Sequence, residues 1–181
     1  TELTPLSFLE RSAGVFADRT AVIDGDRRYT YAELGARVNR LASAVRGAGI
    51  ERNDRVAVLM SNAAPMLEAH FGVPMAGAIL VPINIRLTAG EVAYILDHAG
   101  ARLLLAGAEF APLVHAARER MDRRLPVIWA GGAAGIDETP AEHRAGDRGY
   151  EAFLSGGSPA PFPWRLDPNE GEDATISINY T

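Results

Sequence analysis

The sequence predicts an α/β domain, in which a mostly parallel sheet is flanked by layers of helices. Continuously apolar runs recur along the chain, and they are too short for typical helices but suit strands buried on both faces. Stretches with helical periodicity separate these runs, and capping signals mark where several helices begin. Alternation of strand and helix at this length implies right-handed crossovers and therefore parallel strands.

The first elements that we expect are a hairpin and a helix. Residues 21–23 and 28–31 are β-prone runs around a turn-forming Asp-Gly-Asp sequence. Thr30 lies three residues before Glu33, which is the spacing of a capping box, where each side chain accepts a hydrogen bond from the other residue's backbone N–H. Apolar residues then recur at helical spacing until two closely spaced glycines end the pattern.

Alternating strands and helices follow this first helix. The strands are apolar runs at residues 55–60, 79–83, 102–106 and 125–129. The helices between them cover residues 62–77, 88–100 and 109–121. Thr88 and Glu91 repeat the capping-box spacing at the start of the second of these helices. The pattern predicts one layered domain.

The composition changes after residue 130. The sequence becomes rich in Gly, Pro, Ala and acidic residues, and we expect a mobile loop and linker region over residues 131–173. Within this region, Tyr150 to Leu154 favours a short helix and SGGSPAPFP, at 155–163, a linker. The segment ATISINYT, at 174–181, favours a last strand.

Composition excludes several classes of protein. The 181 residues are 48% hydrophobic and carry a net charge of −5, without long acidic or basic blocks, so no nucleic-acid surface is expected. No apolar stretch reaches the roughly 18 to 20 residues that span a bilayer, and the first residues carry no export signal. The absence of cysteine excludes disulfides and thiolate metal sites and fits a reducing compartment, so we expect a cytoplasmic protein.

Common catalytic and nucleotide-binding motifs are absent. The sequence has no G-x-G-x-x-G after a strand, no G-x-x-x-x-G-K-[ST] and no G-x-S-x-G, so dinucleotide, Walker-type and hydrolase sites lack their parts. No metal site is predicted, because metal-ligand spacing is missing from the four histidines, His70, His98, His115 and His143. His70 lies with Leu67 and Phe71 on the expected apolar face of its helix, where a satisfied boundary histidine is favoured over a proton carrier or pocket wall.

One stretch carries a family resemblance. Residues 72–105 read GVPMAGAILVPINIRLTAGEVAYILDHAGARLLL. They combine a helix end, an apolar strand, the motif Pro-x-Asn-x-Arg-Leu and a capped helix that carries Glu and Tyr-Ile-Leu. In this order the chain closely resembles the AMP-forming acyl-CoA synthetases, also called adenylate-forming enzymes. The resemblance runs from about Leu3 to Thr181 and returns strongly at 174–181.

The resemblance implies an activity and a place in a larger enzyme. Such enzymes join a carboxylate to ATP, release pyrophosphate, and let the thiol of CoA displace AMP from the acyl-adenylate. The chain would be the N-terminal part of the large domain, as a partial domain over residues 1–181 without the C-terminal lid domain. ATP, Mg²⁺, CoA and a short- or medium-chain aliphatic acid would be the ligands, and we expect this chain alone to be inactive.

Two residues take site roles from this resemblance. Thr181 matches the opening of the phosphate-binding loop and would contact ATP, although strand ends of this kind are common without any site. Arg86 aligns with an arginine that approaches the 3′-phosphate of CoA, a role that suits its planar, always charged guanidinium. The alternative is an exposed loop arginine paired with Glu91. No catalytic residue and no metal ligand are assigned.

Other functions remain open at this stage. A stand-alone α/β binding or interaction module would share the fold without chemistry of its own. A peptide-synthetase adenylation domain or a ligase that performs only the thioester step would share the architecture, although the Asn-x-Arg-Leu form favours acyl-CoA ligases. The expected partners are the acid, ATP, CoA and the remaining part of the same enzyme, with homo-oligomers left open.

Overall fold

The computed structural model of the protein describes residues 3–131, 146–164 and 171–180. Its main feature is a parallel sheet of five strands in the order β4-β3-β5-β6-β7. In chain order the strands are β3 (Arg55–Leu59), β4 (Ile79–Pro82), β5 (Ala101–Gly107), β6 (Val127–Ala130) and β7 (Arg148–Gly149). A separate antiparallel hairpin pairs β1 (Thr20–Asp24) with β2 (Arg27–Thr30). The predicted α/β class with a parallel sheet is confirmed.

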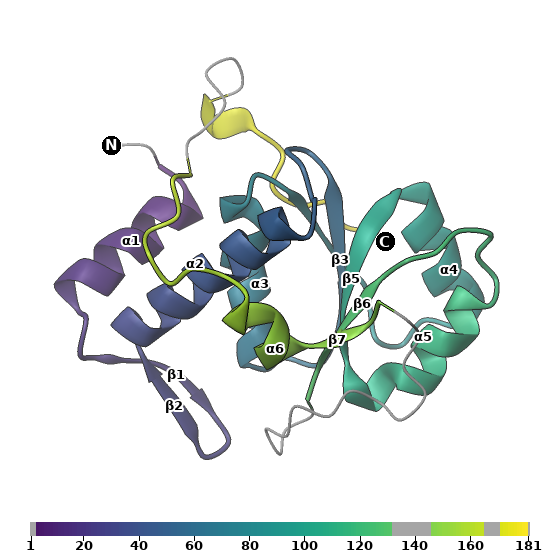
Figure 1. Cartoon of the computed structure of the whole chain (residues 1–181), viewed down its shortest axis with the longest axis horizontal. Coiled ribbons are helices and arrows are strands. Elements are labelled where there is room, and N and C mark those ends of the chain that lie inside the picture. The colour runs from purple at the N-terminus through teal and green to yellow at the C-terminus, as the bar shows by residue number, and fades with distance from the viewer. Residues whose placement is uncertain (1–2, 132–145, 165–170, 181) are drawn as a thin grey trace.

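Helices cover both faces of the parallel sheet, as Figure 1 shows. One face carries α1 (Pro5–Val15), α2 (Tyr31–Gly47), α3 (Ala64–Met75) and α6 (Tyr150–Ser155). The other carries α4 (Ala89–His98) and α5 (Ala111–Arg118), and a 3-10 turn at Ala108–Phe110 precedes α5. Successive strand residues enter two different clusters of buried apolar side chains, one on each face. The central strands are therefore buried on both sides, as their apolar runs predicted.

Capping boxes begin three of the helices. The predicted boxes of α2 and α4 are confirmed, since Thr30 and Thr88 each accept a hydrogen bond from the backbone N–H three residues later and the glutamate there bonds back. A third box opens α1, where Thr4 and Ser7 bond reciprocally and Pro5 occupies the first helical position. The sequence patterns had not indicated α1, because serine takes the place of the usual Glu or Gln.

The buried face of α3 differs from the predicted one. Leu67, which was expected to face the core, is 37% exposed, and His70 is exposed as well. Glu68 is fully buried instead, because Arg37 and Tyr150 bond to its carboxylate. A charged side chain can replace an apolar one in a core when such partners satisfy it.

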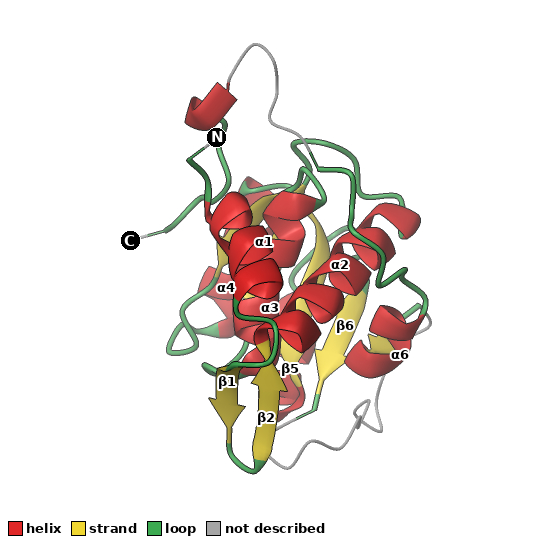
Figure 2. Ribbon diagram, turned by 90° about the vertical axis from the view of Figure 1, so that its left-hand side faces the viewer, coloured by secondary structure: helices red, strands yellow, loops and turns green. Residues whose placement is uncertain are grey.

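α2 and α3 approach each other closely at Gly72. A Cβ built at this glycine would lie 2.7 Å from Cδ2 of Leu41, well inside van der Waals contact. The absence of a side chain therefore lets the backbone of α3 pack directly on α2. Figure 2 shows α1 and α2 lying over this face of the sheet, with the hairpin β1–β2 extending beyond them.

Part of the predicted linker region is packed against α2. Within residues 131–173, the described residues include β7 and α6, which covers the predicted helix Tyr150 to Leu154. The following stretch is held by hydrogen bonds from the N–H of Ser158 to Ser43 Oγ, at 3.1 Å, and from the N–H of Phe162 to Asn39 Oδ1, at 3.0 Å. The rest of the predicted loop, at 132–145 and 165–170, lies outside the described residues.

The predicted last strand is wrong in length. Between 174 and 180 a single parallel bridge forms, from Leu80 of β4 to Ser177. The Leu80 N–H donates to the Ile176 carbonyl at 3.0 Å, and the Ile178 N–H donates to the Leu80 carbonyl at 2.9 Å. The next donor in this ladder would be Pro82, which has no N–H, so the pairing stops there. Thr181 lies outside the described residues.

Candidate functional site

The carboxyl ends of the parallel strands define the first region in which to look for a ligand site. In open α/β sheets, ligands bind in the crevice outside these ends. The loop that follows β4 carries Arg86, and the segment bridged to the outer edge of β4 runs parallel to it and carries Tyr180. The fold thus brings the two stretches that hold the predicted site residues to neighbouring positions along one strand.

Arg86 is exposed in the loop between β4 and α4. Its backbone N–H donates to Asn84 Oδ1 at 3.0 Å, which ties the loop to itself. Glu91 is not its partner, because both the N–H and the hydroxyl of Thr88 donate to the Glu91 carboxylate, at 2.8 and 2.7 Å. These bonds lower the pKa of Glu91. The alternative Arg86–Glu91 pair is therefore not formed in the part of the chain that the structure describes.

Tyr180 is held by the last turn of α4. Its hydroxyl lies 2.8 Å from Nδ1 of His98, and the two rings meet edge to face with centroids 5.8 Å apart. Tyr94, one turn earlier in α4, stacks on His98 at 5.3 Å. The sequence analysis considered His98 only as a possible metal ligand and did not single out Tyr180, because no sequence signal joins residues 82 positions apart.

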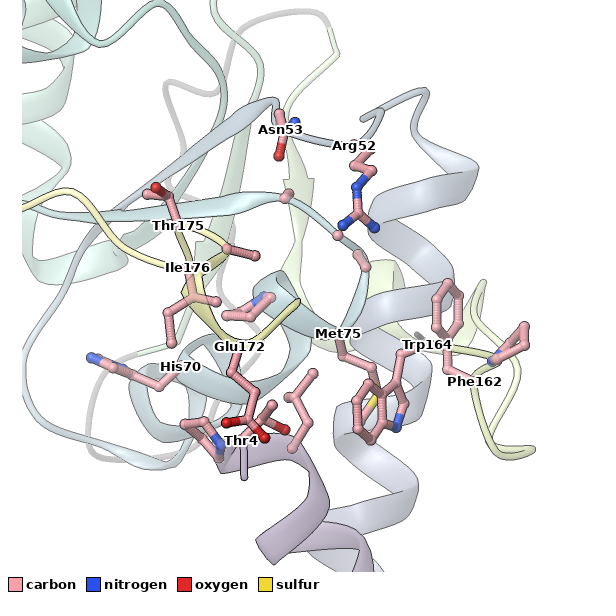
Figure 3. A pocket seen from close by; sticks show the side chains of 18 of the residues that line it. Thr4, Arg52, Asn53, His70, Met75, Phe162, Trp164, Glu172, Thr175 and Ile176 are labelled. Carbon is pink, nitrogen blue, oxygen red and sulfur yellow. The ribbon is translucent and has the colours of Figure 1, made fainter. Parts of the chain in front are cut away.

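A cavity of about 500 Å³ lies elsewhere on the molecule (Figure 3). Its wall includes Arg52 and Asn53, which precede β3, and Gly77 and Ala78, which precede β4. It is therefore at the amino ends of these strands, opposite the edge where α/β sheets bind ligands. His70 lines it, which places this histidine in a pocket wall, and bonds through Nδ1 to the Met66 carbonyl at 2.8 Å. We assign this cavity no part in the chemistry.

A buried ionic network joins α2, α3 and α6. Arg37 Nε donates to Glu68 at 2.6 Å, its Nη2 donates to Glu151 at 2.6 Å, and the Tyr150 hydroxyl donates to Glu68 at 2.8 Å. Burial raises the pKa of Glu68 and of Tyr150. Perturbed groups of this kind can mark active sites. Here Glu68 is fully enclosed and its oxygens are already bonded, so the network serves to join helices.

No metal site is found among the described residues. They contain no group of three or more His, Cys, Asp or Glu side chains that could hold an ion. His143 lies outside the described residues. Across the same part of the chain, no helix combines the length and apolar character needed to cross a bilayer.

The sequence of the chain is similar to known proteins over its whole length. The profile of AMP-binding enzymes matches residues 9–181. The chain is 38% identical over 189 residues to "Acetate--CoA ligase CCL3" of Humulus lupulus, a similarity that covers 100% of the chain and 33% of that protein. It is 38% identical over 193 residues to "Acetate/butyrate--CoA ligase AAE7, peroxisomal" of Arabidopsis thaliana, with the same two coverages. The chain thus spans about a third of the length of these relatives.

A solved structure agrees with the sequence comparisons. The crystal structure of the anthranilate CoA ligase AuaEII in complex with anthranoyl-AMP matches 86% of this chain with a TM-score of 0.76 and 27% identity. The match covers 28% of that chain. The similarity therefore concerns one part of a larger fold.

Proposed function

Because this chain belongs to the family of AMP-binding enzymes, we propose that it is the N-terminal part of an acid:CoA ligase. The complete enzyme joins a carboxylate to the α-phosphate of ATP, so that pyrophosphate leaves, and then lets the CoA sulfur attack the acyl carbonyl, so that AMP leaves. The observation that carries the proposal is similarity over the whole chain to relatives that are named as acid:CoA ligases.

We propose a short- or medium-chain aliphatic acid as the substrate. The names of the two relatives specify acetate and butyrate, and each is 38% identical to this chain. We assign no acyl pocket among the described residues, and the cavity of about 500 Å³ described above lies at the amino ends of the strands.

Arg86 and Thr181 are the residues that we assign to substrates. Arg86 presents an exposed guanidinium that is bonded to no other residue in the described ranges, so it can offer its planar fork to the 3′-phosphate of CoA. Thr181 would supply its hydroxyl and amide to an ATP phosphate, and it directly follows Tyr180, whose hydroxyl bonds to His98 of α4.

We assign no residue of this chain to Mg²⁺. The ion would offset phosphate charge as ATP reacts, but among the described residues no carboxylate and histidine group could hold it. The residues proposed here act on substrate by binding and orientation. For the compartment we propose the cytoplasm, because a chain without cysteine fits a reducing environment, although several relatives are named as peroxisomal.

The test is product analysis with the full-length protein that carries this chain. Incubation with ATP, Mg²⁺, CoA and butyrate should give butyryl-CoA and AMP in equal amounts, with acetate also accepted and palmitate used poorly. Formation of ADP instead of AMP, or no acid-dependent use of ATP with any carboxylate, would contradict the proposal.

Arg86→Ala tests the CoA assignment in the same assay. Loss of a charged contact with phosphate should raise the KM for CoA about tenfold or more and leave the KM for ATP unchanged. Arg102→Ala is the matched control, because this exposed arginine pairs with Asp54 at the opposite end of the strands. An unchanged KM for CoA in the Arg86 variant would remove Arg86 from the site.

A further inference from the structure

The cavity of about 500 Å³ has the size and wall composition of a small-molecule site. Such sites typically measure about 300 to 1,000 Å³ and combine mostly apolar walls with a few polar groups that fix the orientation of the ligand. The start of α1, the ends of α2 and α3, the loop before β3 and described residues after α6 all contribute to its wall. Arg86 is not among its lining residues. A ligand bound here would therefore be one that the proposed CoA contact does not account for.

One wall of the cavity is apolar and firmly held. Met75, at the end of α3, and Trp164 both line it while being only 6% and 9% exposed. Phe162 lies on the same wall, and its N–H donates to Asn39 Oδ1 of α2 at 3.0 Å, which fixes this stretch of chain against the helix. Aromatic rings and a thioether offer a large, polarisable contact area to an apolar molecule.

Arg52 faces this apolar wall from a loop of fixed conformation. The next residue, Asn53, has a left-handed φ of 62°, and its N–H donates to the Gly77 carbonyl at 2.8 Å. A Cβ built at Gly77 would lie 3.6 Å from Cγ of Arg52, so the arginine stem packs close to this glycine. Figure 3 shows the Arg52 side chain pointing from the loop toward Met75 and Trp164. The loop therefore sets the position at which the guanidinium meets a ligand.

The cavity carries an excess of positive charge. Among the described residues that line it, Arg46 and Arg52 are cationic and Glu172 is the only carboxylate, while His70 can add only positive charge. Glu172 already accepts a hydrogen bond from the N–H of Leu3. A guanidinium binds an oxyanion through two parallel N–H donors. An excess of one positive charge beside an apolar wall fits a singly charged oxyanion with an apolar body.

We propose that this cavity binds an amphipathic carboxylate, with the anionic group at Arg52 and Arg46 and the apolar body along Met75, Phe162 and Trp164. A carboxylate is favoured over a phosphate monoester, which carries close to two negative charges at neutral pH. The inference goes beyond the proposed function and does not depend on it. A ligand here contacts α2, α3 and the stretch after α6 together, so it should also raise the melting temperature.

The experiment is photolabelling of the full-length protein with a decanoate analogue that carries a diazirine at the end of its chain. We expect label in the peptides that contain Met75 or residues 162–164. Decanoate should compete with it, whereas decanol, which lacks the charge, and acetate, which lacks the apolar body, should need concentrations at least about tenfold higher. Labelling confined to other parts of the protein would overturn the inference. Stronger competition by decyl phosphate than by decanoate would overturn the assignment to a carboxylate.

Arg52→Gln tests the anion contact in the same experiment. Loss of a charged hydrogen bond should raise the probe concentration that gives half-maximal labelling about tenfold. Arg52 is exposed, so the variant should keep the melting temperature of the ligand-free wild type. Arg28→Gln is the matched control, because this exposed arginine lies in β2 and does not line the cavity. Equal labelling of the wild type and Arg52→Gln would overturn the inference, and since the readout is the position of the label, it is independent of ligase activity.

Discussion

Glu68 shows how a single residue can depart from the hydrophobic pattern and still belong to the core. Its side chain is fully buried between α2, α3 and α6, where Arg37 and Tyr150 donate to its two oxygens. Burial costs the carboxylate its hydration, and the hydrogen bonds from Arg37 and Tyr150 offset part of that cost. The same arginine also binds Glu151, whose side chain is 42% exposed. One guanidinium thus serves a buried and an exposed carboxylate.

Because Glu68 and Glu151 bind the same arginine, substituting each in turn compares the stability contributions of a buried and an exposed carboxylate. Glu68→Ala should lower the free energy of unfolding by about 3 kcal/mol, because it leaves the Tyr150 hydroxyl buried without its acceptor and removes the enclosed partner of Arg37. Glu151→Ala should cost less than about 1 kcal/mol, since its ion pair is exposed to solvent. Urea denaturation of the two variants measures both values. Equal losses would contradict the difference in burial.

Glu68 also predicts a pH dependence of stability. Burial raises the pKa of this carboxyl above its ordinary value of 4.5, so the native state binds its proton more tightly than the unfolded chain does. Its contribution is complete below pH 4.5 and is lost as the pH rises through the raised pKa. The difference in unfolding free energy between wild type and Glu68→Gln should therefore be most favourable to wild type at low pH and decrease as the pH rises. A difference independent of pH would contradict the raised pKa.

At the scale of elements, local sequence signals mark where helices begin, whereas packing determines how helices pair. The capping boxes of α2 and α4 need only residues three apart, and both were predicted from the sequence. The pairing of α2 with α3 depends on Gly72 fitting against Leu41, which are far apart in the chain. Two arginines from outside α4 also cap it at its C-terminal end: Arg55 of β3 donates to the Ala99 carbonyl, and Arg123, in the loop before β6, donates to the Leu96 carbonyl.

Alanine substitutions at two helical glycines distinguish the effect of packing from that of local backbone preference. Gly72→Ala should destabilise the protein by about 1 to 3 kcal/mol, because the new Cβ would lie 2.7 Å from Leu41 in a packed core. Gly90→Ala is the control in α4, where a Cβ meets nothing within 4 Å and lower chain entropy should stabilise by about 0.4 to 1 kcal/mol. Thermal or urea unfolding would show opposite signs. Destabilisation by both substitutions to the same extent would show that helix propensity, and not this contact, governs Gly72.

At the scale of the whole molecule, the sequence was enough to predict the alternation of strands and helices but not the contacts that join distant elements. Apolar runs and capping boxes are local and predicted the class of fold and the central strands. The bond between Glu68 and Tyr150 and that between His98 and Tyr180 each join residues 82 positions apart, which periodicity cannot indicate. The last strand was predicted too long because the absence of an N–H at Pro82 matters only once Leu80 and Ser177 are known to pair.

The described residues include one of the two proposed site residues. Arg86 lies in the loop after β4 as the resemblance implied, and its alternative partner Glu91 is engaged by Thr88. Thr181 stays a prediction, since it lies outside the described residues. The chain spans about a third of the relatives to which it is similar. Under the proposed function, the site would therefore be one part of a larger one.

Acid-dependent exchange of labelled pyrophosphate into ATP, measured side by side for the full-length protein and for residues 1–181 alone, tests the central claim most directly. We predict exchange by the full-length protein with butyrate or acetate and none by residues 1–181, because we assign substrate-binding residues but no catalytic group to this chain. Exchange by residues 1–181 alone, or no exchange by the full-length protein with any carboxylic acid, would contradict the claim that this chain is the N-terminal part of an acid:CoA ligase.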